Sequence, residues 1–470
     1  MKKFINVLAV LLALVMCLGV VVACATDDEG ATDGTTTAAN TTTAANTTKP
    51  NNTQNTTTAE DTTTAEEQPG VETPEVDVPA DGMITSAAQL HAVLVNGDAT
   101  KSYTVNAEKL DMGKYKWSGM VNFAGTFDFG NCTIENAKYS LFVSVANGTI
   151  KNLTIANSTY VYTNDDATAD KASNDASKEG NLYYSPVVRY ASNITIQNVV
   201  IESTVTITSD IYSDKSSHGG VVGFATGSNI LVDNCHFKGA IATDSLAVRI
   251  GGVVGTIDCS DKASLNKDNP AESLARIMNC TNTGKVENVG TGQDSKAAGV
   301  IGYMANAAAV NCANYGEMIS SDNGQTAGVV GYVGNETCMM NCLNAGAVKG
   351  NQFVGGVCGY SNGSERYFTN CINIATVENT GGTHDGGIVG LAKSSEKLTN
   401  CFNLKSVREK FVNNVNNVAV DPADATTHAS LVLNNCGNLD TIDAIFTAIE
   451  AAAPGVFEKA DGSLRLVIAE

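Results

Sequence analysis

The sequence "GGVCGYSNGSERYFTNCINIATV" at residues 355–377 repeats a pattern that the chain has already used. "AGVVGYVGNETCMMNCLNAGAV" at 327–348 and "AGVIGYMANAAAVNCANYGEM" at 298–318 precede it. Each copy has a small-Gly-aliphatic-x-Gly unit, then an Asn-Cys pair, then an aliphatic or Met residue six positions after the cysteine. A pattern that returns about every thirty residues predicts an array in which each repeat is one supersecondary unit.

The array extends well beyond these three copies. Asn-Cys pairs stand at 234–235, 279–280, 311–312, 341–342, 370–371, 400–401 and 435–436. Glycine units stand at 219–223, 251–255, 298–302, 327–331, 355–359 and 386–390. Weaker upstream copies place Asn131, Asn152 and Asn198 where the pair has its asparagine.

The spacing of apolar residues selects the kind of repeat. Helical repeats need apolar residues at i, i+3 and i+4 over a dozen positions, whereas these units have short β-branched runs broken by Gly, Asn and Ser. We therefore expect an all-β fold: a right-handed parallel β-helix (solenoid) with two or three short strands per turn. Turns stacked about 4.8 Å apart place each residue on its own copies, so asparagines can form hydrogen-bonded ladders.

The repeats resemble GLUG-motif repeats, whose unit is close to GGxVGxxxG…xNCxNxGxV. Residues 101–155 are similar to the lead-in that often precedes such repeats, and 84–97 to its short helix, with Ser86 and Gln89 placed for a capping box. The resemblance covers about residues 84–440 and implies a bacterial surface protein of the adhesin type. GLUG repeats also occur beside peptidase domains, but this sequence has no His-Glu-x-x-His motif.

The N-terminus has the pattern of an export signal. Residues 1–23 combine a basic start with an apolar run, although a retained membrane-spanning anchor has a similar pattern. "VVAC" at 21–24 resembles the lipobox of bacterial lipoproteins, which implies that Cys24 is lipidated and becomes the new N-terminus. Two acyl chains give stable membrane anchoring without a spanning helix.

Composition divides the rest of the chain. We expect a signal peptide at 1–23, lipidated Cys24 and a disordered Thr/Asn/Ala-rich linker at 24–80, and an N-terminal cap with the first turns at 81–210. The repeat β-helix follows at 211–440. Residues 441–470 break the pattern with a short helix and a strand, which suit a C-terminal cap over the open end.

Several functions are excluded by composition. A net charge of −20 makes the chain a poor ligand for nucleic acid. The glycine units lack the Lys-Ser/Thr of a phosphate-binding loop. Cysteines fall one per turn without paired Cys-x-x-Cys spacing, so we expect a column of buried free thiols and neither a metal site nor a cofactor. A disulfide at Cys259 or Cys338 is the alternative to free thiols at those positions.

One register carries aromatic residues that could bind a ligand. Each glycine unit is followed by Phe224, Thr256, Tyr303, Tyr332, Tyr360 or Leu391. An outward-facing register would form an aromatic stripe able to stack on sugar rings. Strand alternation instead places it on the same face as the preceding aliphatic residues, which favours the core. Tyr303, Tyr332 and Tyr360 are nevertheless the candidate ligand-binding residues.

We expect no catalytic residues, because the repeat strands hold Val, Asn, Cys and Gly and the five histidines are scattered. The favoured function is a monomeric, lipid-anchored protein on the outer face of the bacterial cell membrane. It would bind a glycan or a host or cell-surface protein. The alternatives are a carbohydrate-active β-helix enzyme and a structural surface spacer with no specific ligand.

Overall fold

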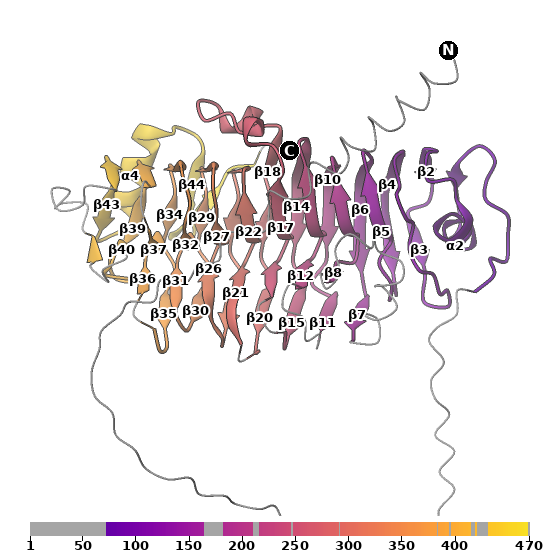
Figure 1. Ribbon diagram of the computed structural model, residues 1–470, viewed down its shortest axis with the longest axis horizontal. Coiled ribbons are helices and arrows are strands. Elements are labelled where there is room, and N and C mark those ends of the chain that lie inside the picture. The colour runs from indigo at the N-terminus through magenta and orange to yellow at the C-terminus, as the bar shows by residue number, and fades with distance from the viewer. Residues whose placement is uncertain are drawn as a thin grey trace, which may run out of the picture. The chain divides into compact units, whose positions relative to one another are not determined.

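The computed structural model describes residues 72–163, 182–209, 216–245, 248–290, 292–382, 384–393, 396–414, 419–420 and 431–468. The chain divides into two units, Met1–Ala65 and Glu66–Glu470, and all described residues lie in the second. Four sheets, named A to D here, make up most of this unit. Figure 1 shows their strands following one another in chain order, from indigo to yellow.

Sheet A has nineteen strands: β1 (Met83–Ile84), β2 (Tyr103–Val105), β3 (Lys109–Asp111), β4 (Thr126–Glu135), β6 (Thr149–Ala156), β10 (Thr195–Ile201), β14 (Ile230–Phe237), β18 (Ala275–Met278), β19 (Thr281–Asn282), β23 (Ala308–Val310), β24 (Ala313–Asn314), β28 (Thr337–Met340), β29 (Leu343–Asn344), β33 (Arg366–Thr369), β34 (Ile372–Asn373), β38 (Glu396–Thr399), β39 (Phe402–Leu404), β42 (Val432–Asn434) and β43 (Gly437–Leu439).

Sheet B has ten strands: β5 (Phe142–Ala146), β9 (Val188–Ser192), β13 (Val222–Gly227), β17 (Val254–Cys259), β22 (Ile301–Ala305), β27 (Val330–Val333), β32 (Cys358–Ser361), β37 (Val389–Ala392), β40 (Val412–Asn414) and β41 (Ala419–Val420). Sheet C has seven: β7 (Thr159–Tyr162), β11 (Thr206–Ser209), β15 (Ala240–Thr243), β20 (Lys285–Asn288), β25 (Met318–Ser320), β30 (Val348–Gly350) and β35 (Val377–Asn379). Sheet D has seven: β8 (Leu182–Tyr184), β12 (Ser216–Gly219), β16 (Arg249–Gly251), β21 (Gln293–Ala298), β26 (Asn323–Ala327), β31 (Phe353–Gly355) and β36 (His384–Gly386).

The pairing confirms a mostly β fold built from long parallel sheets. From β6 to β37 each turn passes through sheets A, C, D and B in that order, and the next turn pairs with it in parallel. The described pairing β40–β41 is antiparallel and ends sheet B. The expectation of two or three strands per turn is wrong, because the turns from β6 to β37 have four or five. The asparagine of the Asn-Cys pair has a positive φ, 51° at Asn311 and 57° at Asn341, and in the later turns it lies between the two short strands of sheet A.

Two asparagine ladders run along sheet A. The buried inner ladder joins successive turns through side-chain amides: Asn282 donates to Asn314 at 2.7 Å, and Asn314 to Asn344 at 2.9 Å. The outer ladder uses the asparagine of the Asn-Cys pair, for example Asn341 to Asn311 at 2.9 Å. Both ladders confirm the predicted stacking of identical residues, and each amide satisfies its neighbour.

The core is shared by all four sheets. Ile277, Val286, Ile250 and Ile301, from sheets A, C, D and B, are fully buried in one continuous cluster. The eleven described cysteines are free, as predicted. Thiols of the Asn-Cys column donate to carbonyl groups one turn away, as Cys312 does to Ile277 at 3.6 Å.

Helices and irregular segments cover sheet A and the first turns. Helix α2 (Ala87–Asn96) is capped by Ser86, whose hydroxyl accepts from the Gln89 backbone N–H at 3.3 Å, which confirms the N-cap. The Gln89 side chain accepts from the Thr85 backbone N–H rather than from that of Ser86, so the predicted capping box forms only in part. Helix α4 (Ile442–Ala452) and the hairpin β44 (Phe457–Ala460) and β45 (Ser463–Leu466) pack on the outer face of sheet A. The insertion with the 3-10 turns η2 (Lys262–Ser264) and η3 (Pro270–Glu272) packs on the same sheet.

Candidate functional site

The candidate tyrosines lie outside the apolar core, so the expectation from strand alternation is wrong. Ile301 and Met304 are both fully buried in the core, whereas Tyr303 between them is half-buried and lies outside it. The glycine that ends each unit is the cause. A Cβ atom on Gly302 would lie 2.7 Å from the backbone nitrogen of Ile250, so only glycine lets sheet D approach sheet B here.

A second column from sheet D faces these tyrosines. Its members are in register from turn to turn: Tyr183, Ser217, Arg249, Lys296, Gln325, Phe353 and His384. The sequence analysis missed them. From Ser217 on, each member lies two residues before a small-Gly unit. This constant spacing could have identified the column from the sequence. We call the two facing columns the B/D corner.

Direct contacts join the two columns. The Arg249 guanidinium lies 4.5 Å from the ring centre of Tyr303, and the Lys296 ammonium lies 5.8 Å from that of Tyr332. The rings of Phe353 and Tyr360 stack at 5.2 Å with 18° between their planes. The B/D corner is therefore a packed seam of aromatic rings, cations and amides along the outside of the solenoid.

The tyrosine rings of the B/D corner pack against one another. Tyr303 and Tyr332 stack at 5.1 Å with only 9° between planes, and Tyr332 meets Tyr360 edge to face at 5.3 Å. A sugar ring therefore meets ring edges and hydroxyl groups here rather than open ring faces. Burial raises the pKa of Tyr360 to about 12, so its hydroxyl stays protonated at neutral pH. The Tyr332 hydroxyl accepts from Asn362 Nδ2 at 3.2 Å.

An ion pair lies inside the solenoid behind this seam. Arg366 Nη2 and Glu396 Oε1 are 3.0 Å apart, and the two side chains are 0% and 1% exposed. Burial is the main influence on the Arg366 pKa and lowers it, while Glu396 opposes that shift. An acid–base pair in catalysis must reach substrate. At this depth the pair joins neighbouring turns of sheet A instead.

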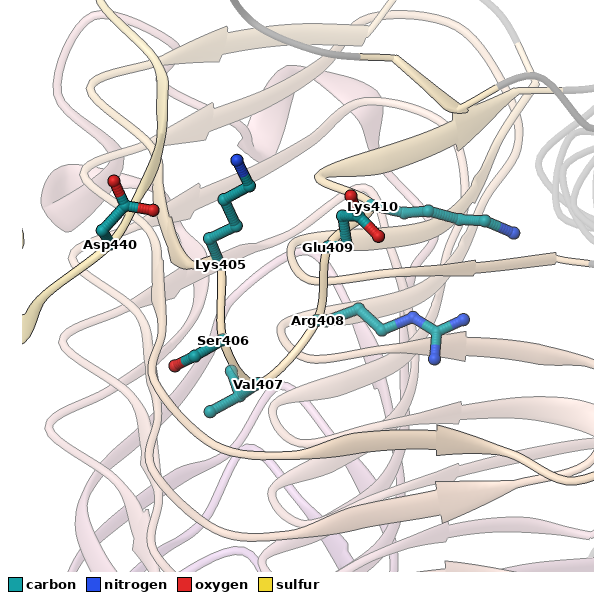
Figure 2. A pocket seen from close by; sticks show the side chains of 7 residues that line it. All are labelled: Lys405, Ser406, Val407, Arg408, Glu409, Lys410 and Asp440. Carbon is teal, nitrogen blue, oxygen red and sulfur yellow. The ribbon is translucent and has the colours of Figure 1, made fainter.

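A pocket of about 570 Å³ lies at the C-terminal turns. Figure 2 shows its lining from Lys405 to Lys410 and Asp440, with the Arg408 and Lys410 side chains pointing away from Lys405 and Asp440. Arg408 and Lys410 both pair with the buried carboxylate of Asp385 in sheet D. Arg408 and Lys410 are thus held by Asp385 and, for Arg408, by the Val377 carbonyl oxygen of β35, and they do not meet Lys405 or Asp440 across the pocket. The loop therefore closes the last turn of sheets C and D rather than forming a binding site.

Other expectations concern metal and membrane. Among the described residues, no three His, Cys, Asp or Glu side chains gather as they would around a metal ion. No helix in that part of the chain has the length and hydropathy to cross a bilayer. The predicted signal peptide and Cys24 lie outside the described residues.

Comparison with known proteins adds little. No family model matches the chain, so the resemblance to GLUG repeats stays a prediction, and no curated protein matches either. One solved structure that matches is a Bacteroides ovatus protein provisionally named an immunoglobulin A1 protease. It shares 16% identity over 83% of this chain and 92% of that chain, with a TM-score of 0.39.

Proposed function

We propose that this chain is a lipid-anchored protein on the outer face of the bacterial cell membrane, and that its solenoid binds an extended ligand without catalysis. The anchor rests on the lipobox-like sequence at 21–24 and on the polar linker that follows it. Binding rests on the B/D corner, where side chains of one register repeat on consecutive turns. A hydroxyl-rich polymer such as a glycan is the first candidate.

The contacts of the B/D corner define how such a ligand would be held. Stacked turns repeat at about 4.8 Å, so a polymer lying along the axis meets a similar set of groups at each turn. The tyrosine hydroxyls remain protonated donors, and the half-buried guanidinium of Arg249 adds a cation. Recognition would therefore rest on hydrogen bonds at ring edges, since the ring faces are already in contact.

The test removes the hydroxyls and keeps the rings. The purified chain is passed over immobilised mucins, matrix proteins and polysaccharides. Saturable retention on one class should fall at least tenfold when Tyr303, Tyr332 and Tyr360 are all changed to Phe. The matched control is Tyr367→Phe on the outer face of sheet A. Equal loss in the control, or full retention by the triple variant, would refute binding at this corner.

A structural spacer is the second candidate function. The observation that favours it is the stacking of Tyr303 on Tyr332, which leaves little ring surface for a ligand. Absence of retention on every immobilised partner, with the protein folded, would favour the spacer over the binding function.

We also propose the finer features of the solenoid. Right-handed connection between parallel strands is strongly preferred, which supports a right-handed coil. Helix α2 supports an N-terminal cap, because Leu90, Val93 and Leu94 pack into the first turns. Residues 441–470 support a C-terminal cap that extends over the side of sheet A.

A further inference from the structure

An irregular site interrupts sheet D between β21 and β26. The pairing register shifts between Gln293 and Lys296, which marks a β-bulge. Within it Asp294 has φ of 73°, in the left-handed region that Asp, like Asn, adopts more readily than most residues. Bulges re-aim side chains and are over-represented next to active sites. The feature therefore calls for a chemical explanation.

The bulge places the Asp294 carboxylate between an amine and an amide. Asp294 Oδ2 lies 2.7 Å from Lys296 Nζ, and its Oδ1 accepts from Gln325 Nε2 at 3.3 Å. Lys296 and Gln325 are direct neighbours on consecutive turns and are 9% and 4% exposed. The Gln325 carbonyl oxygen is buried and makes no hydrogen bond within the described part of the chain.

We propose that Lys296 and Gln325 join in an intramolecular amide bond, with Asp294 as the proton carrier. Lys296 gives a proton to the Asp294 carboxylate, and the resulting amine attacks Cδ of Gln325. The Nζ–Cδ bond forms and the Cδ–Nε2 bond breaks. Asp294 passes its proton to the leaving nitrogen, and the second Nζ proton follows the same route. Ammonium leaves, the total charge is unchanged, and no oxidant or other co-reactant is needed.

Proximity makes this reaction feasible without a separate enzyme. Asp294 holds the Lys296 amine and the Gln325 amide on its two carboxylate oxygens, and groups positioned by a shared partner react at effective concentrations on the order of 10⁵–10⁸ M when well oriented. Lys296 is restrained further, since its Nζ also donates to the Asp294 carbonyl oxygen at 2.8 Å. The reaction is needed only once per molecule. Its product would be a covalent link between consecutive turns, whether or not the B/D corner binds a ligand.

Mass spectrometry of the full-length chain tests the proposal. Glu317 lies between the two residues, so an endopeptidase that cuts after glutamate separates them unless they are linked. We expect one joined peptide pair that lacks the mass of one ammonia, and the same loss in the intact protein. Separate peptides with unmodified Lys296 and Gln325, from protein that is folded by circular dichroism, would overturn the proposal.

Variants assign the roles. Gln325→Leu should restore separate peptides, and Asp294→Asn should do the same while leaving the amine and amide in place. The matched control is Lys285→Arg, which alters an ion pair with Glu287 on sheet C and should leave the link intact. A link that persists in Asp294→Asn would overturn the proton-carrier role. If a variant misfolds, the peptide map of the unaltered chain still decides whether the bond exists.

Discussion

Acid should destabilise this protein through one buried histidine. His218 in β12 is 1% exposed, its ring lies 5.3 Å from that of Tyr184, and neither ring nitrogen has a hydrogen-bond partner among the described residues. Burial lowers the pKa of His218 to about 3. The imidazole is therefore neutral in the folded protein over the whole range in which it becomes charged in the unfolded chain.

The magnitude follows from proton linkage. With an unfolded pKa of about 6.5, the unfolded state binds a proton below that pH and the folded state does not. This contribution is near zero at pH 7. It lowers the free energy of unfolding by about 2 kcal/mol at pH 5 and about 3 kcal/mol at pH 4, until the folded form also titrates near pH 3.

Urea unfolding at pH 7 and pH 5 measures the effect. The unaltered chain should lose about 2 kcal/mol more stability on acidification than His218→Phe, which keeps an aromatic ring against Tyr184. His384→Phe is the control and should retain the loss, because His384 is only half-buried. Equal acid sensitivity in His218→Phe and the unaltered chain, or an NMR titration of His218 near pH 6.5, would refute the reasoning.

Four further predictions concern the packing. Arg366→Met should cost about 3–5 kcal/mol in unfolding free energy, because it removes the cation that pairs with the buried Glu396 carboxylate, and adding Glu396→Leu should recover most of that loss. Asn344→Ala should cost at least about 2 kcal/mol by the same measurement, since it leaves ladder partners on both sides unsatisfied. Gly302→Ala should unfold the corner or lower the melting temperature sharply, because its Cβ would meet sheet D backbone. In thiol labelling of the folded chain, Cys436 should react first among the described cysteines, because the other ten are buried.

The stacking of turns could be predicted from sequence because it depends on identity between copies. Asn282, Asn314 and Asn344 recur two residues after the cysteine, and a side chain that must pair with its own copy leaves a visible repeat. The N-cap at Ser86 is likewise a local interaction that depends on a few adjacent residues. Both predictions are confirmed.

Whether the tyrosine side chains point into or out of the core could not be predicted in the same way. Alternation assumes an unbroken strand, and Gly302 removes that condition by letting another sheet approach its backbone. The neighbouring backbone belongs to sheet D, and its position depends on the length and path of the whole turn rather than on residues near Gly302. The bulge at Asp294 escaped prediction for the same reason, because one extra residue relative to the next turn is invisible within a single copy.

By contrast, one position of the repeat indicates which turns of sheet A are covered by the C-terminal helix α4 and the β44–β45 hairpin. The residue after the cysteine of the Asn-Cys pair is in turn His236, Thr281, Ala313, Leu343, Ile372, Phe402 and Gly437. Its four apolar members are the ones buried beneath α4 and the β44–β45 hairpin, in a cluster separate from the main core. Single apolar residues also occur on exposed surface, but here four consecutive copies at one outward position are apolar, and all four are buried under the C-terminal segment. The change at Ala313 therefore marks how far back along the solenoid the C-terminal segment reaches, and the Leu466 amide donating to Tyr315 at 2.9 Å lies at that limit.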